Sequence, residues 1–229
     1  MYHRVLLKIS GEALSSESAV MCSETIHTTV MHLKTIWQTG VQIGVVVGGG
    51  NIIRGRSAEG MERNRADHMG MLATMINALA LQDALEKANV PCVVQSAIEM
   101  ERICDSFTAR SAKKALEEGK VVIFACGSGC PFFSTDTAAA LRAAEIGADA
   151  LLLAKNVDAI YSADPKKDPN AVRYSRITYD RVVAENLRAT DLTAITLCKE
   201  QKIPIRVFAL DQIELIFEND SIGTHIQEI

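Results

Sequence analysis

Short apolar runs alternate with amphipathic stretches along most of the chain. Runs of valine, leucine and isoleucine predict buried strands, and apolar residues three and four positions apart predict helices. The predicted strands are Val5–Ile9, Val41–Val47, Pro91–Gln95, Val121–Cys126, Ala150–Ala154 and Ile205–Leu210. The predicted helices are Thr25–Thr39, Arg65–Ala88, Ala109–Glu118, Thr135–Ala144 and Asp180–Gln201.

Strands that alternate with helices in this way predict an α/β fold, with a parallel sheet covered by helices on both faces. The segment Val157–Tyr174 departs from the alternation, because its two Asp-Pro pairs favour a loop or hairpin over a helix. The chain shows no internal repeat, low-complexity tract or flexible linker, so we expect residues 1–229 to form a single domain.

Composition narrows the class of protein. The chain has 229 residues, 48% hydrophobic and 23% charged, which is typical of a soluble protein. A net charge of −4 argues against a nucleic-acid or anionic-membrane partner. Long apolar runs and a signal-peptide pattern are both missing, so we expect a cytoplasmic location. The six cysteines form no CxxC or zinc-type spacing, which favours free thiols and predicts no protein metal site.

Glycines follow three of the predicted strands, at Ser10-Gly11, Gly48-Gly49-Gly50 and Gly127-Ser128-Gly129. In open α/β sheets, ligands bind beyond the carboxyl ends of the strands. Any one of these glycines would fit a tight turn between a strand and a helix. Three such strand ends together predict one long binding site along a single edge of the sheet.

The triple glycine is followed by Arg54, and this combination predicts a phosphate-binding turn. Glycine-rich turns expose backbone N–H groups that attract anions, and arginine binds phosphate through two parallel hydrogen bonds. The GxxxxGKS/T and GxGxxG patterns are both absent. Their absence excludes a P-loop protein, a Rossmann dinucleotide site and a protein kinase of the usual kind.

Five stretches carry a resemblance to a known family: LLKISGEAL (6–14), GVVVGGGNIIRG (44–55), ADHMGMLATMINALALQDAL (66–85), GSGCPFFSTDTAAALRAAEI (127–146) and VDAIYSADPKKDP (157–169). With them, the chain resembles the bacterial uridylate (UMP) kinases, a branch of the amino-acid kinase superfamily, from Arg4 to Thr224. The third and fourth stretches are specific to that branch, whereas the glycine and Asp-Pro elements are shared across the superfamily.

The resemblance implies a three-layer αβα sandwich of the carbamate-kinase type that phosphorylates UMP to UDP with ATP. It also implies Mg²⁺ carried with ATP, a homohexamer, and inhibition by UTP. One alternative is a superfamily kinase that acts on a carboxylate or carbamate, against which the 66–85 stretch counts. Another is a nucleotide-binding regulator without catalysis, against which the presence of Lys8, Arg54, Asp136 and Asp191 counts.

The resemblance assigns catalytic roles to Lys8, Asp136 and Asp191. Lys8 ends an apolar run, where a lysine either reaches solvent along its stem or meets a partner. Phosphoryl transfer depends on positioning and charge neutralisation, which a cation at this strand end would supply without a dedicated base. Asp136 and Asp191 each allow two interpretations, a helix N-cap or a carboxylate that orients the catalytic lysine.

The resemblance assigns UMP binding to Gly49, Arg54, Asp67, Ser128, Gly129, Cys130, Pro131, Phe132, Phe133, Ser134 and Thr135. Asp67 would accept hydrogen bonds from the ribose hydroxyls, although a carboxylate at a helix start also interacts with the helix dipole. Cys130 stands where many relatives carry a polar residue such as asparagine. A reactive thiol and an inert packing thiol are both open at that position.

The resemblance assigns ATP binding to Lys8, Ser10, Gly11, Gly50, Arg54, Asn156, Tyr161 and Asp164. The contact just before Val157 aligns with either Lys155 or Asn156. GTP-activated relatives carry basic residues where this chain has Gln82, Glu86 and Val93. We therefore expect weak activation by GTP or none.

Overall fold

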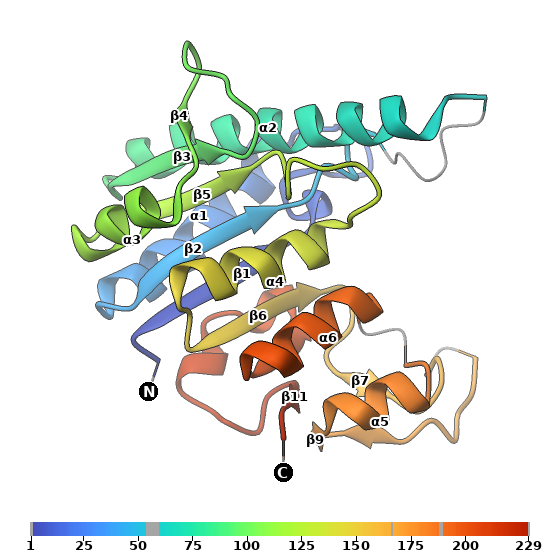
Figure 1. Cartoon of the computed structure of the whole chain (residues 1–229). Helices are drawn as coiled ribbons and strands as arrows, with labels where there is room; N and C mark the ends of the chain where they lie inside the picture. Colours follow the sequence, from blue (N-terminus) through green and yellow to red (C-terminus); the bar gives the residue numbers. More distant parts are fainter. Residues whose placement is uncertain (1, 54–59, 166, 188–189, 229) are drawn as a thin grey trace.

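A central sheet organises the computed structural model, which describes residues 2–53, 60–165, 167–187 and 190–228. Within this part of the chain, nine strands pair in the order β4-β3-β5-β2-β1-β6-β10-β11-β9 (Figure 1). They are β1 (Arg4–Ile9), β2 (Gln42–Val47), β3 (Cys92–Ser96), β4 (Asp105–Ser106), β5 (Val121–Ala125), β6 (Ala150–Lys155), β9 (Arg176–Ile177), β10 (Ile205–Ala209) and β11 (Thr224–Ile226). All neighbouring pairs are parallel except β10 and β11, so the predicted parallel sheet is confirmed.

Helices cover both faces of the sheet and complete three layers (Figure 1). One face carries α1 (Ser23–Gln38) and α2 (Arg63–Lys87). The other face carries α3 (Ala109–Glu117), α4 (Thr135–Ile146), α5 (Tyr179–Ala184) and α6 (Leu192–Gln201). Short 3₁₀ turns are η1 (Gly11–Leu14), η3 (Leu210–Gln212) and η4 (Leu215–Phe217). A separate hairpin pairs β7 (Ile160–Tyr161) with β8 (Arg173–Tyr174), which confirms the loop or hairpin expected there.

Side-chain alternation along β1 determines what each face of the sheet meets. Val5, Leu7 and Ile9 pack into the core beneath α1 and α2. Leu6 packs into the opposite core, which α4 helps to form. Lys8 shares the parity of Leu6 and lies at the carboxyl end of the strand, so it reaches the side where α4 begins.

The single helix expected over Asp180–Gln201 is wrong. The structure has two helices, α5 and α6, with Asn186 between them in a left-handed conformation at φ 49°. Asp191 caps the second helix, because its side chain accepts a hydrogen bond from the backbone N–H of Ala194. This break positions Asp191 beside the start of α4.

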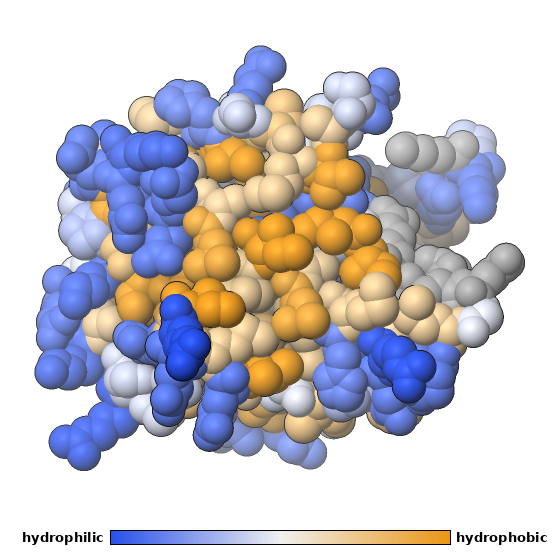
Figure 2. All heavy atoms as spheres, turned by 90° about the horizontal axis from the view of Figure 1, so that it is seen from above, coloured by the Kyte–Doolittle hydropathy of each residue, from blue (hydrophilic) through white to orange (hydrophobic). Residues whose placement is uncertain are grey.

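The exposed face of α2 carries an apolar patch, formed by Met69, Leu72 and Ile76 with exposed fractions of 39, 49 and 47%. Figure 2, which looks down on this side of the molecule, shows apolar atoms gathered near its centre. Contiguous exposed apolar surface is typical of an interaction site. Across the described residues, none of the helices has the length and apolar character needed to cross a membrane.

Candidate active site

Glycines at the ends of β1 and β2 allow close backbone contacts. A Cβ added to Gly49 would lie 2.8 Å from the Gly70 carbonyl oxygen and 2.9 Å from the Ala73 Cβ, both on α2. A Cβ added to Gly11 would lie 2.2 Å from Asn51 Oδ1. Both approaches are too short for any side chain, so close packing explains these two glycines.

A buried amide pair fixes the turn after β2. Asn77 on α2 is fully buried and donates to the Gly48 carbonyl oxygen at 2.7 Å and to Asn51 Oδ1 at 2.8 Å. Asn51 returns a hydrogen bond to Asn77 Oδ1 at 3.2 Å. Because buried polar groups are costly without partners, this pairing holds the glycine turn against α2.

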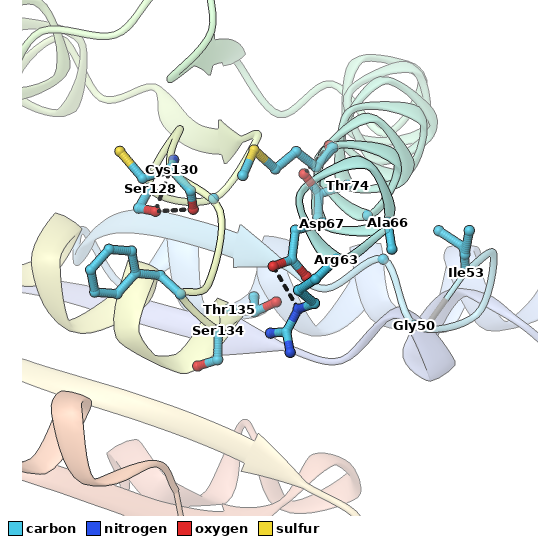
Figure 3. Close-up of a pocket in the computed structure, with 15 residues that line it drawn as sticks. Gly50, Ile53, Arg63, Ala66, Asp67, Thr74, Ser128, Cys130, Ser134 and Thr135 are labelled. Carbon is cyan, nitrogen blue, oxygen red and sulfur yellow. Dashed lines mark hydrogen bonds and ion pairs between the residues drawn. The ribbon is translucent and has the colours of Figure 1, made fainter. Parts of the chain in front are cut away.

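A cavity of about 340 Å³, the glycine pocket, opens between this turn, the first turns of α2 and the loop that leads into α4 (Figure 3). Its lining residues are Gly49, Gly50, Ile53, Arg63, Ala66, Asp67, Gly70, Met71, Thr74, Gly127, Ser128, Cys130, Phe133, Ser134 and Thr135. Most of the residues predicted to bind UMP therefore meet around one cavity. Gly129, Pro131 and Phe132 lie on the same loop outside this lining.

Asp67 connects α2 to the loop across the glycine pocket. Its Oδ2 accepts from Arg63 Nε at 2.8 Å and from the backbone N–H of Phe132 at 2.9 Å. The helix begins at Arg63 and is capped by Glu62. Asp67 therefore lies one turn inside α2, and the expectation that it stands at the helix start is wrong. The helix-dipole interpretation of Asp67 is weakened by that position, because the effect fades beyond the first turn.

The base of the loop is held from two sides. Thr74 on α2 accepts a hydrogen bond from the backbone N–H of Cys126 at 2.8 Å. Arg142 on α4 donates to the carbonyl oxygen of Gly127 at 3.2 Å. Cys126 and Gly127 both have positive φ, at 61° and 59°. The side chains of Thr74 and Arg142 hold this strained turn in place.

Ser134 and Asp191 join α4 to α6. Ser134 is the N-cap of α4, because its hydroxyl accepts from the backbone N–H of Thr137 at 3.1 Å. The same hydroxyl donates to Asp191, which also accepts from Thr137 Oγ1 at 2.7 Å. The N-cap interpretation is therefore confirmed for Asp191 on α6 and is wrong for Asp136.

Asp136 lies between two lysines at the carboxyl ends of neighbouring strands. Its Oδ1 is 2.8 Å from Lys8 Nζ and its Oδ2 is 2.5 Å from Lys155 Nζ. Thr190 donates a further hydrogen bond to Oδ2 at 2.8 Å. The side chains of Lys8, Asp136 and Lys155 are only 10, 13 and 20% exposed, so solvent screens this cluster weakly.

The two ammonium groups control the ionisation of Asp136. Burial alone would raise the pKa of this carboxyl, but Lys8 and Lys155 outweigh burial and hold the pKa well below its usual range. Burial lowers the pKa of Lys155, and attraction to Asp136 opposes that shift. Asp191 lies close enough to interact with Lys155 as well, so two lysines here face two carboxylates. The ammonium N–H groups are donors of the kind that bind an anionic ligand such as phosphate.

A second cavity, the lysine pocket, has a volume of about 560 Å³ and lies against this cluster. It is lined by Lys8, Ser134, Thr135, Asp136, Lys155, Asn186, Leu187, Thr190, Asp191 and Leu192. Ser134 and Thr135 line both cavities, so the glycine pocket and the lysine pocket share a wall at the start of α4.

Several residues predicted to bind ATP line neither cavity: Ser10, Gly11, Asn156, Tyr161 and Asp164. Tyr161 donates to Asp158 Oδ1 at 3.0 Å, and Asn156 donates to Glu12 Oε2 at 3.5 Å. Their ATP roles stay predictions. Arg54 lies outside the described residues, so its predicted phosphate contact stays a prediction as well.

Sequence reasoning missed Arg63, Thr74 and Thr190 and left Lys155 as one of two alternatives. Arg63 precedes Asp67 by four positions, a spacing that places both on one face of a helix and could have identified the pair. Lys155 lies beside β1 because β6 pairs with β1, and this pairing cannot be predicted from the local sequence. Local sequence carries no signal for Thr74.

Comparison with known proteins decides the family. The Amino acid kinase family matches residues 3–209. The chain belongs to this family. An aspartate kinase from Synechocystis, 20% identical, shares the fold over 99% of this chain and 40% of its own, with a TM-score of 0.72.

Within the amino acid kinase family, solved UMP kinases are similar over nearly the whole chain. The Ureaplasma parvum UMP kinase is 38% identical, covers 100% of both chains and has a TM-score of 0.93. The Bacillus anthracis UMP kinase is 33% identical, covers 99% of this chain and 96% of its own, and has a TM-score of 0.95. The Archaeoglobus fulgidus uridylate kinase is 30% identical, covers 97% of this chain and 99% of its own, and has a TM-score of 0.74. The resemblance predicted from sequence is confirmed.

Proposed function

We propose that this protein transfers the γ-phosphoryl group of ATP to UMP and so forms ADP and UDP. The observation that carries the proposal is the shared wall of the two cavities. UMP occupies the glycine pocket, with Asp67 facing its ribose, and the phosphates of ATP occupy the lysine pocket. Similarity to three UMP or uridylate kinases supports this choice of acceptor.

The acceptor atom is a phosphate oxygen of UMP, which is already ionised at neutral pH and requires no base. This oxygen forms a bond to the γ-phosphorus, and the bond from that phosphorus to the β–γ bridging oxygen breaks, so ADP leaves with the bridging oxygen. Lys8 and Lys155 neutralise the charge that spreads over the transferred group. Asp136 holds both lysines in position through its ion pairs with them.

The residues at the site do not fit a magnesium ion held by the protein. Both oxygens of Asp136 are engaged by lysines, and Asp191 accepts from Ser134, Thr137 and Ala194. The described residues contain no group of three or more acidic, histidine or cysteine side chains placed to ligate a metal. In our proposal, Mg²⁺ arrives on the phosphates of ATP, and the chain contributes its lysines.

Two further expectations belong to this proposal. UTP shares its uridine with UMP, so it should compete for the glycine pocket and inhibit the reaction. The apolar patch of Met69, Leu72 and Ile76 supports self-association, and a homohexamer is the assembly expected for this branch of the family.

Measurement of ADP release with and without an acceptor tests the proposed reaction. UMP should stimulate release strongly, whereas aspartate, acetate and carbamate should not. Stimulation by a carboxylate or carbamate in place of UMP would favour another reaction of the superfamily. Tight UMP and ATP binding without ADP release would point to a non-catalytic nucleotide-binding protein.

A further inference from the structure

Arg63 occupies the first position of α2 and lines the glycine pocket. Its Nε donates to Asp67 Oδ2, one helical turn further on, at 2.8 Å. The Arg63 side chain is 41% exposed, and that of Asp67 is 14% exposed. The arginine therefore reaches from the rim of the pocket towards a carboxylate within it (Figure 3).

The guanidinium of Arg63 has donors to spare. Of its N–H groups, those on Nη1 and Nη2 make no hydrogen bond to any residue that the structure describes. Figure 3 shows this end of the side chain pointing away from α2, on the side where Ser134 and Thr135 lie. A planar pair of terminal nitrogens matches two oxygens of one phosphate group.

Two contacts hold this guanidinium in a fixed orientation. Asp67 accepts from its Nε, and its Cζ lies 5.6 Å from the centroid of the Phe132 ring. Phe132 is itself tied to Asp67 through its backbone N–H, although its φ of 73° is strained for an aromatic residue. An arginine held this way loses little freedom when it binds a ligand.

The position of Arg63 indicates which part of a ligand it meets. All four residues line the glycine pocket, and Figure 3 shows the guanidinium of Arg63 near Asp67 and on the side of the pocket where Ser134 and Thr135 lie. The Lys8–Asp136–Lys155 cluster lies beyond the shared wall at the start of α4. In the proposed function, on which this inference rests, the acceptor phosphate must lie between the ribose and that cluster.

We infer that Arg63 binds the 5′-phosphate of the acceptor nucleotide through Nη1 and Nη2, while its Nε orients Asp67. Arg63 is then a substrate-binding residue as well as a positioning residue. The two roles make different predictions, because uridine has the ribose of UMP but lacks the phosphate.

Calorimetric titration of UMP and of uridine into wild type, Arg63→Gln and Asp67→Asn separates these roles. A lost charge-assisted pair predicts that Arg63→Gln weakens UMP binding by roughly 10-fold or more. Uridine binding should weaken by a smaller factor, about 3-fold, since Asp67 remains but loses the hydrogen bond that orients it. Asp67→Asn should weaken both ligands. Arg65→Gln is the matched control, because it removes an exposed positive charge two positions away that does not line the pocket.

Equal losses for UMP and uridine in Arg63→Gln would overturn the inference, since they would show that Arg63 acts through Asp67 alone. Unchanged UMP binding would overturn it too. Arg63→Lys keeps the charge without the planar fork, and it should show a smaller loss confined to UMP if the glutamine variant fails to fold. Wild-type protein that binds UMP and releases ADP keeps the proposed function even when the arginine variants contradict this inference. If the wild-type protein binds no UMP, both the proposed function and the inference about Arg63 are contradicted.

Discussion

Arg142 Nη2 donates to the carbonyl oxygen of Gly127 at 3.2 Å, at the first left-handed glycine of the loop that precedes α4. The Arg142 side chain is only 4% exposed, and its guanidinium lies 3.9 Å from the centroid of the Phe107 ring. Glu145, one turn further along α4, pairs with it. A buried cation with three partners fixes the path of the loop relative to α4.

Arg142→Met should raise the KM for UMP by about 10-fold while changing the KM for ATP much less, because it removes one charged hydrogen bond from the base of the loop. Initial-rate kinetics with each substrate varied in turn measure the two constants. Glu145→Gln is the matched control, because it leaves the Arg142–Gly127 hydrogen bond in place. Equal changes in both KM values would indicate a general loss of structure.

Lys8→Ala and Lys155→Ala should each lower kcat by roughly 10³-fold, the effect of removing a group that stabilises transition-state charge. Folding and UMP binding should persist, since neither lysine lines the glycine pocket. Steady-state kinetics with parallel UMP titrations give both quantities. Lys114→Ala, a surface change with a side chain 77% exposed, serves as the control. Near-wild-type turnover in a folded Lys8→Ala protein would remove Lys8 from the mechanism.

Asp67→Asn should reduce the preference for UMP over dUMP. A carboxylate that accepts a hydrogen bond from a ribose hydroxyl loses that hydrogen bond when the hydroxyl is missing. The loss costs about 1–3 kcal/mol of binding free energy. The ratio of kcat/KM for the two nucleotides measures the preference in wild type and variant. Asp83→Asn, on the exposed part of the same helix, should leave the ratio unchanged. A ratio that is also unchanged in Asp67→Asn contradicts the ribose assignment.

Cys130 should be alkylated before the buried thiols, and UMP should protect it. It is exposed and lines the glycine pocket, whereas burial raises the pKa of Cys92 to about 11 and of Cys198 to about 12. Only thiolates react rapidly, so those two stay inert near neutral pH. Mass spectrometry after alkylation with and without UMP identifies the modified sites.

Cys130→Ser provides the control for alkylation, because Cys22 can react with the reagent too. Backbone N–H groups at the start of α1 lower the pKa of the Cys22 thiol. Activity of the serine variant should resist the reagent. If Cys130 stays unmodified, it is a packing residue, and if activity is lost through another cysteine, the loop has been interpreted wrongly.

Asp136 should contribute stability that disappears in acid. Its pKa is lower in the folded protein than in the unfolded chain, so the folded state binds fewer protons there. The contribution is complete above the unfolded pKa of about 3.9 and is lost as the pH falls below it. Urea unfolding between about pH 6 and pH 3 should therefore show a shallower decline for Asp136→Asn than for wild type. Parallel declines would show that Asp136 is not held ionised by the lysines.

The sequence predicted those features that local pattern controls. The apolar run Val5–Ile9 predicts a buried strand, because successive side chains of a strand point to opposite faces and each face of the sheet packs into its own core. The break between α5 and α6 was missed because Glu185, Asn186 and Leu187 carry no proline or glycine to stop a helix. Tertiary contacts of Asp191 with Ser134 and Thr137 override that local tendency.

The charged cluster was only partly visible in the sequence for a similar reason. Lys8 and Asp136 could be assigned from motifs, but Lys155 joins them through the pairing of β1 with β6. The ion pair between Arg63 and Asp67 follows from helical spacing, whereas the contact of each with Phe132 depends on a loop 65 positions further along the chain than Asp67. Contacts of that kind are determined by the fold as a whole.

The place of Lys8 in the sheet also limits how the molecule can move. Lys8 is paired with Val46 of β2 on one side and with Leu153 of β6 on the other. Amide protons of a strand enclosed in this way exchange with solvent only when much of the protein opens. The backbone that carries Lys8 is therefore expected among the slowest-exchanging parts of the chain, so this lysine is presented to the lysine pocket from a rigid strand.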